Sequence, residues 1–125
     1  GLSFATGTSW GTFGILIPIV VACFQGIDHT MMILSMSACM AGAVCGDHCS
    51  PISDTTIMSS AGAQCLHINH VSTQIPYALT AALSSAVAYI VAGLTKHALL
   101  GLAAGFAVLL VVMLVLRQKT GKETE

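Results

Sequence analysis

Two carboxylates, an imidazole and several hydroxyls lie close together in the middle of this chain. The run Gly46-Asp47-His48-Cys49-Ser50-Pro51-Ile52-Ser53-Asp54-Thr55-Thr56 interrupts a long apolar segment. Ionisable groups at membrane depth are costly and usually mark an ion or substrate pathway. Carboxylate, hydroxyl and freed carbonyl oxygens suit a small hard cation. The ion-binding or coupling candidates are Asp47, Ser50, Ser53, Asp54, Thr55 and Thr56, with sodium at Asp47 and Asp54 as the hypothesis and His48 as a weaker candidate.

The same carboxylates can couple a cation to protons. A buried carboxylate favours its neutral form, whereas a bound cation favours the ionised form. Cation and proton would then compete for one site, and that competition is the basis of exchange. The simpler interpretation is that Asp47 and Asp54 only cap helix ends and accept structural hydrogen bonds.

The apolar segment that contains these residues, 31–65, is too long for one straight membrane helix. It would be about 52 Å long as a continuous helix, and the hydrocarbon core is about 30 Å thick. Pro51 cannot donate a backbone hydrogen bond and disfavours helix at Ser50. We predict a break around residues 46–51, with Ser50 capping a second half-helix that begins at Pro51. Transporters use such discontinuous helices to bind ions.

A second polar stretch, Thr6-Gly7-Thr8-Ser9-Trp10-Gly11-Thr12, precedes the first apolar run. It is a candidate for another broken helix that faces the first one, with Thr8, Ser9 and Thr12 as weaker ion-site candidates. The alternative is an ordinary interfacial turn with Trp10 anchored among the lipid headgroups.

The composition indicates a membrane protein. Charged residues make up 7% of the chain and hydrophobic residues 55%, whereas a soluble domain carries about 25% charged residues. We predict an all-α, polytopic helical bundle, and place His67–His70 in a polar loop. The expected spans are 7–25, 31–65 (broken), 73–94 and 98–116, followed by a polar tail at 117–125.

The charges near the chain end predict the orientation. Arg117, Lys119 and Lys122 outnumber Lys96, so the positive-inside rule places the tail in the cytoplasm. No basic patch is present to neutralise phosphates, and we therefore expect no nucleic-acid partner. Because about four spans are few for a transporter built of two repeats, we expect an N-terminal part of the same protein to be missing.

Metal and enzyme alternatives have weaker support. Five cysteines are an odd number outside any loop-rich framework, which disfavours a disulfide scaffold. The groups Cys45-x-x-His48-Cys49 and Cys65-x-His67-x-x-His70 match no common zinc module, and about 20 Å of helix would separate them, so no zinc site is expected. Asp47, His48 and Ser50 lack the spacing of a known catalytic motif, so we expect no enzyme. A purely structural membrane subunit is a further alternative.

Three sequence runs resemble the NhaC family of sodium/proton antiporters. The first is the run 46–56 followed by Ser59-Ser60-Ala61-Gly62-Ala63, and the second is Gly7-Thr8-Ser9-Trp10-Gly11-Thr12-Phe13-Gly14. The third is His70-Val71-x-Thr73-Gln74-x-Pro76-Tyr77-Ala78. The similarity covers about residues 1–95, as expected for the C-terminal part of such an antiporter.

The resemblance implies a multi-pass carrier of the cytoplasmic membrane that exchanges sodium ions for protons. It also implies that the two polar stretches lie close together. The alternative within the family is a sodium- or proton-coupled antiporter of organic acids such as malate and lactate, or of amino acids. Sodium and protons are then transported species and no cofactor is expected. The expected partners are the lipid bilayer and the rest of the transporter, and a homo-oligomer is compatible with this interpretation.

Overall fold

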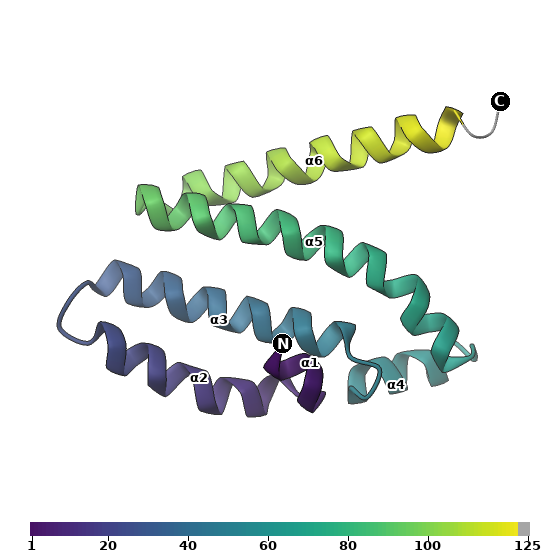
Figure 1. The fold of residues 1–125 in the computed structure, drawn as a ribbon, viewed down its shortest axis with the longest axis horizontal. Coiled ribbons are helices and arrows are strands. Elements are labelled where there is room, and N and C mark those ends of the chain that lie inside the picture. The colour runs from purple at the N-terminus through teal and green to yellow at the C-terminus, as the bar shows by residue number, and fades with distance from the viewer. Residues whose placement is uncertain (123–125) are drawn as a thin grey trace. The chain divides into compact units, whose positions relative to one another are not determined.

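The computed structural model describes residues 1–122, and the side chains of residues 1–118. The described chain is helical and contains no strand, which confirms the predicted all-α fold. It divides into two compact units, Gly1–Leu79 and Thr80–Glu125, and α5 begins in the first and continues into the second. The helices are α1 (Leu2–Thr6), α2 (Ser9–Phe24), α3 (His29–Cys49), α4 (Asp54–Gly62), α5 (His67–Thr95) and α6 (Ala98–Lys122) (Figure 1).

In the first unit, α2 and α3 form an antiparallel pair and α1 packs against α3 (Figure 1). Both members of the pair begin at a side-chain cap. The Thr8 hydroxyl accepts a hydrogen bond from the Gly11 N–H, and the Asp28 carboxylate accepts two, from the Thr30 and Met31 N–H groups. Such caps satisfy donors that the first helical turn leaves free.

The predicted helix break is present, but it lies at residues 50–53 rather than 46–51. Gly46, Asp47 and His48 belong to the last turn of α3, and Ser53 rather than Ser50 is the N-cap residue of α4. The Ser53 N–H donates to the Ser50 carbonyl over 3.3 Å, which closes a turn with Pro51 at its second position. The fixed φ of proline suits that turn position, so Pro51 ends α3 without starting α4.

The predicted polar loop at His67–His70 is wrong, because these residues form the first turn of α5. The chain reverses earlier, just after α4. Gln64 adopts a left-handed conformation (φ 52°), its N–H donates to the Ala61 carbonyl, and the Cys65 N–H donates to the Ser60 carbonyl. This hydrogen-bond pattern ends helices without a polar loop.

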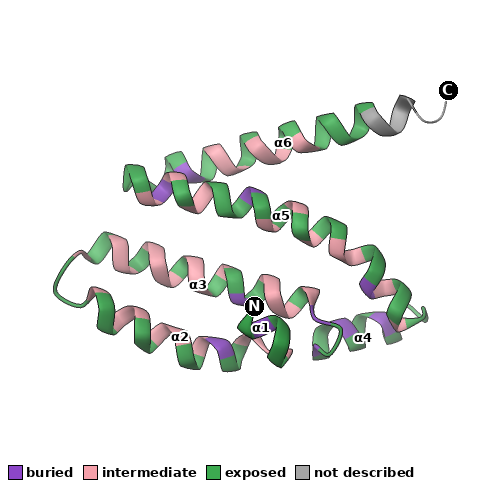
Figure 2. Cartoon of the chain, viewed as in Figure 1, coloured by how far each residue is buried: buried purple, intermediate pink, exposed green. Residues whose placement is uncertain are grey.

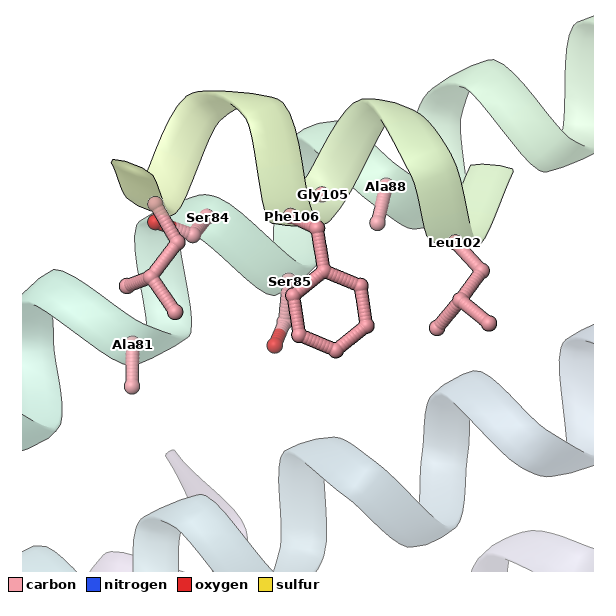
Figure 3. A pocket seen from close by; sticks show the side chains of 8 residues that line it. Ala81, Ser84, Ser85, Ala88, Leu102, Gly105 and Phe106 are labelled. Atoms are coloured by element: carbon pink, nitrogen blue, oxygen red, sulfur yellow. The ribbon is translucent and has the colours of Figure 1, made fainter. Parts of the chain in front are cut away.

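In the second unit, α5 and α6 approach through small residues. A Cβ added to Gly101 would lie 2.5 Å from the Ala92 Cβ and 2.8 Å from the Ala88 carbonyl oxygen. A shallow apolar groove opens beside this contact, between Ser84 and Ala88 of α5 and Gly105 and Phe106 of α6 (Figure 3). Close backbone approach through glycine and alanine is typical of membrane helices.

The predicted tail is helical as far as the structure describes it. Helix α6 continues past residue 116 to Lys122, and residues 123–125 of the predicted 117–125 tail lie outside the described part of the chain.

Three helices are long and apolar enough to cross a membrane. They are α3, α5 and the part of α6 that spans Ala98–Gln118, whereas α2 is a shorter apolar helix. The distribution of buried residues is inverted relative to a soluble domain, because large hydrophobic side chains are mostly exposed and the buried set is rich in serine and threonine (Figure 2). The outward apolar surface suits lipid or other membrane helices as a partner.

Candidate ion-binding site at two helix breaks

A second helix break precedes α2. Helix α1 ends at Thr6, Gly7 turns the chain with a left-handed φ of 65°, and Thr8 then caps α2. The Thr8 carbonyl accepts a hydrogen bond from the buried Thr12 hydroxyl over 2.9 Å. Of the three weaker candidates in this stretch, Thr8 and Thr12 therefore belong to the structure of the break. Ser9, also half-buried, is the first residue of α2.

The two breaks lie against each other. The fully buried Ser50 hydroxyl, in the break between α3 and α4, donates to the Phe4 carbonyl of α1 over 2.8 Å. The Ser3 hydroxyl lies 2.6 Å from the Ala43 carbonyl of α3. A Cβ added to Gly7 would lie only 3.0 Å from the Ile52 carbonyl oxygen, so glycine permits this close approach.

Asp47 lies in the last turn of α3, one turn before the break. Its Oδ1 atom is buried and has no hydrogen-bond partner among the described residues. Nearly all buried polar atoms in proteins have a partner, and an unpaired one is costly. A buried, unpaired carboxylate oxygen beside a helix C-terminus is chemically suited to a bound cation or a proton, and both are species that an ion carrier handles.

Hydroxyls from the start of α4 line the other side of the break. The Ser53 and Thr55 hydroxyls are 2.8 Å apart, and the buried Thr56 hydroxyl donates to the His48 carbonyl over 3.5 Å. A hydroxyl that donates its hydrogen keeps oxygen lone pairs for a cation. The breaks thus concentrate oxygen atoms in a largely apolar chain.

Not all predicted site residues converge. Asp54 is the first residue of α4, and both it and Thr55 are exposed within the described part of the chain. No described hydrogen bond joins Asp54 to Asp47. The His48 side chain is also exposed, and its backbone carbonyl is the group that contacts Thr56.

The sequence interpretation missed several polar residues that the structure uses. Ser3, which precedes the polar stretch 6–12, donates a hydrogen bond from α1 to α3. His67 contacts both α4 and the break between α3 and α4. Gln74, within the run 70–78, has a buried Oε1 atom without a partner among the described residues. The only signal for these residues was a polar side chain in apolar surroundings.

The cysteine and histidine residues with zinc-type spacing do not form a metal-binding cluster among the described residues. Within the described residues, no three histidine, cysteine or acidic side chains are arranged to hold a metal ion. All five cysteines lie in the described chain and have free thiols.

These features are those of a helical membrane protein in which two helix breaks lie against each other, beside buried hydroxyls and a buried Asp47 Oδ1 atom without a partner among the described residues. Residues 1–94 match the Na+/H+ antiporter family. The chain therefore belongs to the Na+/H+ antiporter family, which confirms the resemblance to NhaC-type antiporters. No solved structure matches the chain.

Three relatives show how much of a transporter this chain represents. It is 51% identical over 94% of its length to an uncharacterized protein of Haemophilus influenzae, of which it covers 23%. It is 36% identical over 74% of its length to an uncharacterized Na(+)/H(+) antiporter of the same organism and covers 20% of it. It is 32% identical over 74% of its length to the malate-2H(+)/Na(+)-lactate antiporter of Bacillus subtilis and covers 19% of it. The chain thus spans about a fifth of the length of these proteins.

Proposed function

We propose that this chain forms the ion-binding part of a secondary transporter that exchanges sodium ions for protons. The observation that carries this proposal is the buried, unpaired Asp47 Oδ1 next to the contact between two helix breaks. Sodium would bind the ionised carboxylate, and a proton would neutralise the same group once sodium has left. Either species removes the cost of an unpaired buried charge.

The surrounding oxygens complete the proposed sodium site. Ser50, Ser53 and Thr56 are buried at the break. The Ser50 and Thr56 hydroxyls donate to carbonyls and keep oxygen lone pairs for a cation, and the Ser53 hydroxyl shares a hydrogen bond with that of Thr55. Thr55 and Asp54 follow at the start of α4, whose N-terminus favours negative groups. Thr8, Ser9, Thr12 and His48 stay as weaker candidates.

The Bacillus subtilis relative favours a second candidate, a sodium- and proton-coupled exchange of organic acids or amino acids. In that case the carboxylates would bind the coupling ion. An organic anion would need a cationic or helix N-terminal partner, and the predicted spans contain no arginine or lysine between residues 1 and 94. In this part of the transporter, the N-terminus of α4 is the partner that such an anion would have.

The membrane location, the orientation and the partners of the chain follow from the same proposal. The chain would work in the cytoplasmic membrane with its C-terminal tail in the cytoplasm, together with the rest of the transporter and as a monomer or homo-oligomer. We propose no enzymatic activity, no cofactor and no nucleic-acid partner, with sodium and protons as cargo.

The test is sodium-driven proton flux by the complete transporter in proteoliposomes. Asp47→Asn keeps the shape of the side chain but removes its charge. We expect its sodium half-saturation constant to rise by about tenfold or more, equivalent to about 1.4 kcal/mol. Asp54→Asn should have a smaller effect, because that carboxylate is exposed. Asp28→Asn is the matched control, since Asp28 caps α3 away from either break.

Each outcome has a clear meaning. Wild-type sodium affinity in Asp47→Asn would refute the proposed site, and unchanged transport in Asp54→Asn would remove that residue from it. Flux that requires malate, lactate or an amino acid on the opposite side would favour the second candidate function.

A further inference from the structure

Helix α5 carries a row of polar side chains that begins at a helix break. The Nε2 atom of His67, its first residue, lies 2.7 Å from the Pro51 carbonyl oxygen in the break between α3 and α4. His70, Gln74 and Tyr77 follow at spacings of three, four and three residues. Such spacings place side chains on one face of a helix. The polar row therefore extends from the break along α5 for about 15 Å.

The opposite face of the same part of α5 is apolar. Spacings of seven, four and four residues place four large apolar side chains there, namely Ile68, Ile75, Leu79 and Leu83. Ser72 also lies on that face, but its hydroxyl donates to the Ile68 carbonyl within the helix. Helix α5 is long and apolar enough to cross a membrane. Its apolar face suits lipid, whereas the polar row would be costly to place in lipid.

Gln74 gives independent evidence that the polar row needs a partner. Its Oε1 atom is buried and has no hydrogen-bond partner among the described residues. An amide oxygen only accepts, so its partner must donate a hydrogen or carry a positive charge. The neighbouring Thr73 hydroxyl, in contrast, donates to the Asn69 carbonyl within the helix. Water or a hydrated cation can supply what the Gln74 oxygen needs, and a lipid chain cannot.

The polar row ends at Tyr77, whose side chain is 79% exposed in this chain. A tyrosine hydroxyl both donates and accepts, and a tyrosine in apolar surroundings usually finds a polar partner for it. Further along α5, the same face holds Ala88, where α6 packs. A Cβ added to Gly105 of α6 would lie only 2.8 Å from the Ala88 Cβ. The polar row thus lies between the helix break and the part of α5 that packs against α6.

We propose that His70, Gln74 and Tyr77 line a water-filled path that leads to the helix break, and that sodium ions and protons reach the break along it. The path is inferred from the faces of α5, whereas its cargo rests on the proposed exchange function. Water beside the polar row would donate to the Gln74 Oε1 atom and bond to the Tyr77 hydroxyl. Irregular backbone at membrane depth, such as these breaks, occurs where protein or a water-filled cavity satisfies its polar groups.

The test is the reactivity of single introduced cysteines in the complete transporter in proteoliposomes. His70→Cys, Gln74→Cys and Tyr77→Cys carry the thiol on the polar row, and Ile75→Cys and Leu79→Cys are the matched controls on the opposite face. The probe is a small cationic methanethiosulfonate that does not cross lipid, added on both sides of the membrane. Mass spectrometry of the labelled peptides identifies each cysteine that has reacted, so the native cysteines stay in place.

We expect the three cysteines of the polar row to react at least about tenfold faster than the two controls, because the reactive thiolate forms in water and is disfavoured in lipid. The probe leaves a fixed positive charge, which repels a cation on the path. Labelled molecules of the three row variants should therefore lose sodium-driven proton flux. The two control variants should keep the flux of equally treated wild type.

Equal reactivity of both faces would overturn the path, because this part of α5 would then lie in bulk water or at the membrane interface. Slow reaction of all five cysteines would also overturn it. Fast reaction of the polar row without loss of flux would overturn its role for ions. If Gln74→Cys does not fold, Tyr77→Cys decides, because that side chain is exposed. Absence of flux in the wild type would refute the proposed function, and the labelling pattern would still decide whether the path exists.

Discussion

Both units of this chain contain helices that are apolar enough to cross a membrane, but they join their helices by different means. In the first unit, hydroxyls donate between elements, as Ser50 does to the Phe4 carbonyl of α1. In the second unit, Gly101 lets α6 approach Ala88 and Ala92 of α5 without any side chain of its own. The buried Ser84 of that unit bonds within its own helix, to the Thr80 carbonyl.

The difference follows from the helix breaks. An unbroken helix satisfies its own backbone groups, so two such helices need only shape complementarity in order to pack. A break frees N–H and C=O groups that lipid cannot satisfy, and other protein groups must then take their place. The hydroxyls of the first unit fill this role, and the same oxygens are available to a cation. The proposed ion site therefore lies in the first unit, where the breaks gather hydroxyls, whereas glycine lets α5 and α6 pack closely in the second unit.

The largest stability effect is expected in the second unit. Gly101→Ala would place a methyl group 2.8 Å from the Ala88 carbonyl oxygen, and a backbone atom cannot move aside easily. Overpacking of this kind costs about 1–3 kcal/mol. We expect a lower midpoint in thermal unfolding of the complete transporter in detergent, with sodium affinity unchanged in the protein that remains folded.

Gly93→Ala is the matched control within the same unit. Nothing in the described structure lies within 4 Å of a Cβ at Gly93. Alanine there should leave stability unchanged or raise it by up to about 1 kcal/mol through helix propensity. Equal destabilisation by both substitutions would mean that close approach at Gly101 does not hold α5 and α6 together.

The sequence predicted the helix break because glycine, charges and proline occur together, but it misplaced the break by a few residues. Pro51 fits equally well at the first position of a helix and at the second position of a turn. Ser50 and Ser53 are equally good caps. The choice depends on contacts with α1, such as the one from Ser50 to the Phe4 carbonyl, and no local pattern contains them.

The contacts of His67 could not be predicted from the sequence for the same reason. A polar residue just after a turn is typical of a loop, and the partner that makes it structural, Pro51, lies 16 residues earlier in the chain. Asp47, in contrast, was identified because a carboxylate inside an apolar segment is informative by itself. The role of Asp47 in an ion site stays a prediction, whereas a residue that only joins segments, such as His67, carries no comparable signal in the sequence.

A smaller effect is expected for the hydroxyl contact between the two breaks. Ser50→Ala removes the hydrogen bond to the Phe4 carbonyl at a fully buried position. Hydrogen bonds between membrane helices contribute about 0.6 kcal/mol on average and up to about 1.7 kcal/mol. Thermal unfolding should show a loss in this range, and sodium affinity should also fall because Ser50 is a proposed ligand.

The control for Ser50 is Ser72→Ala. Ser72 is exposed and donates to the Ile68 carbonyl within α5. That carbonyl keeps its helical environment, so both stability and sodium affinity should stay close to wild type. A loss of stability without any loss of sodium affinity in Ser50→Ala would mean that this hydroxyl joins the breaks but does not bind the ion.

The smallest effect concerns the turn that brings His67 back to α4. Gln64 has a left-handed φ of 52° there, a conformation that glycine adopts without a Cβ penalty. Gln64→Gly removes that penalty but also adds freedom to the unfolded chain, so the net gain should be about 0.5–1 kcal/mol. Gln25→Gly is the matched control, because Gln25 has a φ of −61° and glycine relieves nothing there. A higher unfolding midpoint in Gln64→Gly than in Gln25→Gly would show that this turn is strained. Equal midpoints would mean that its hydrogen bonds to α4 already offset the strain.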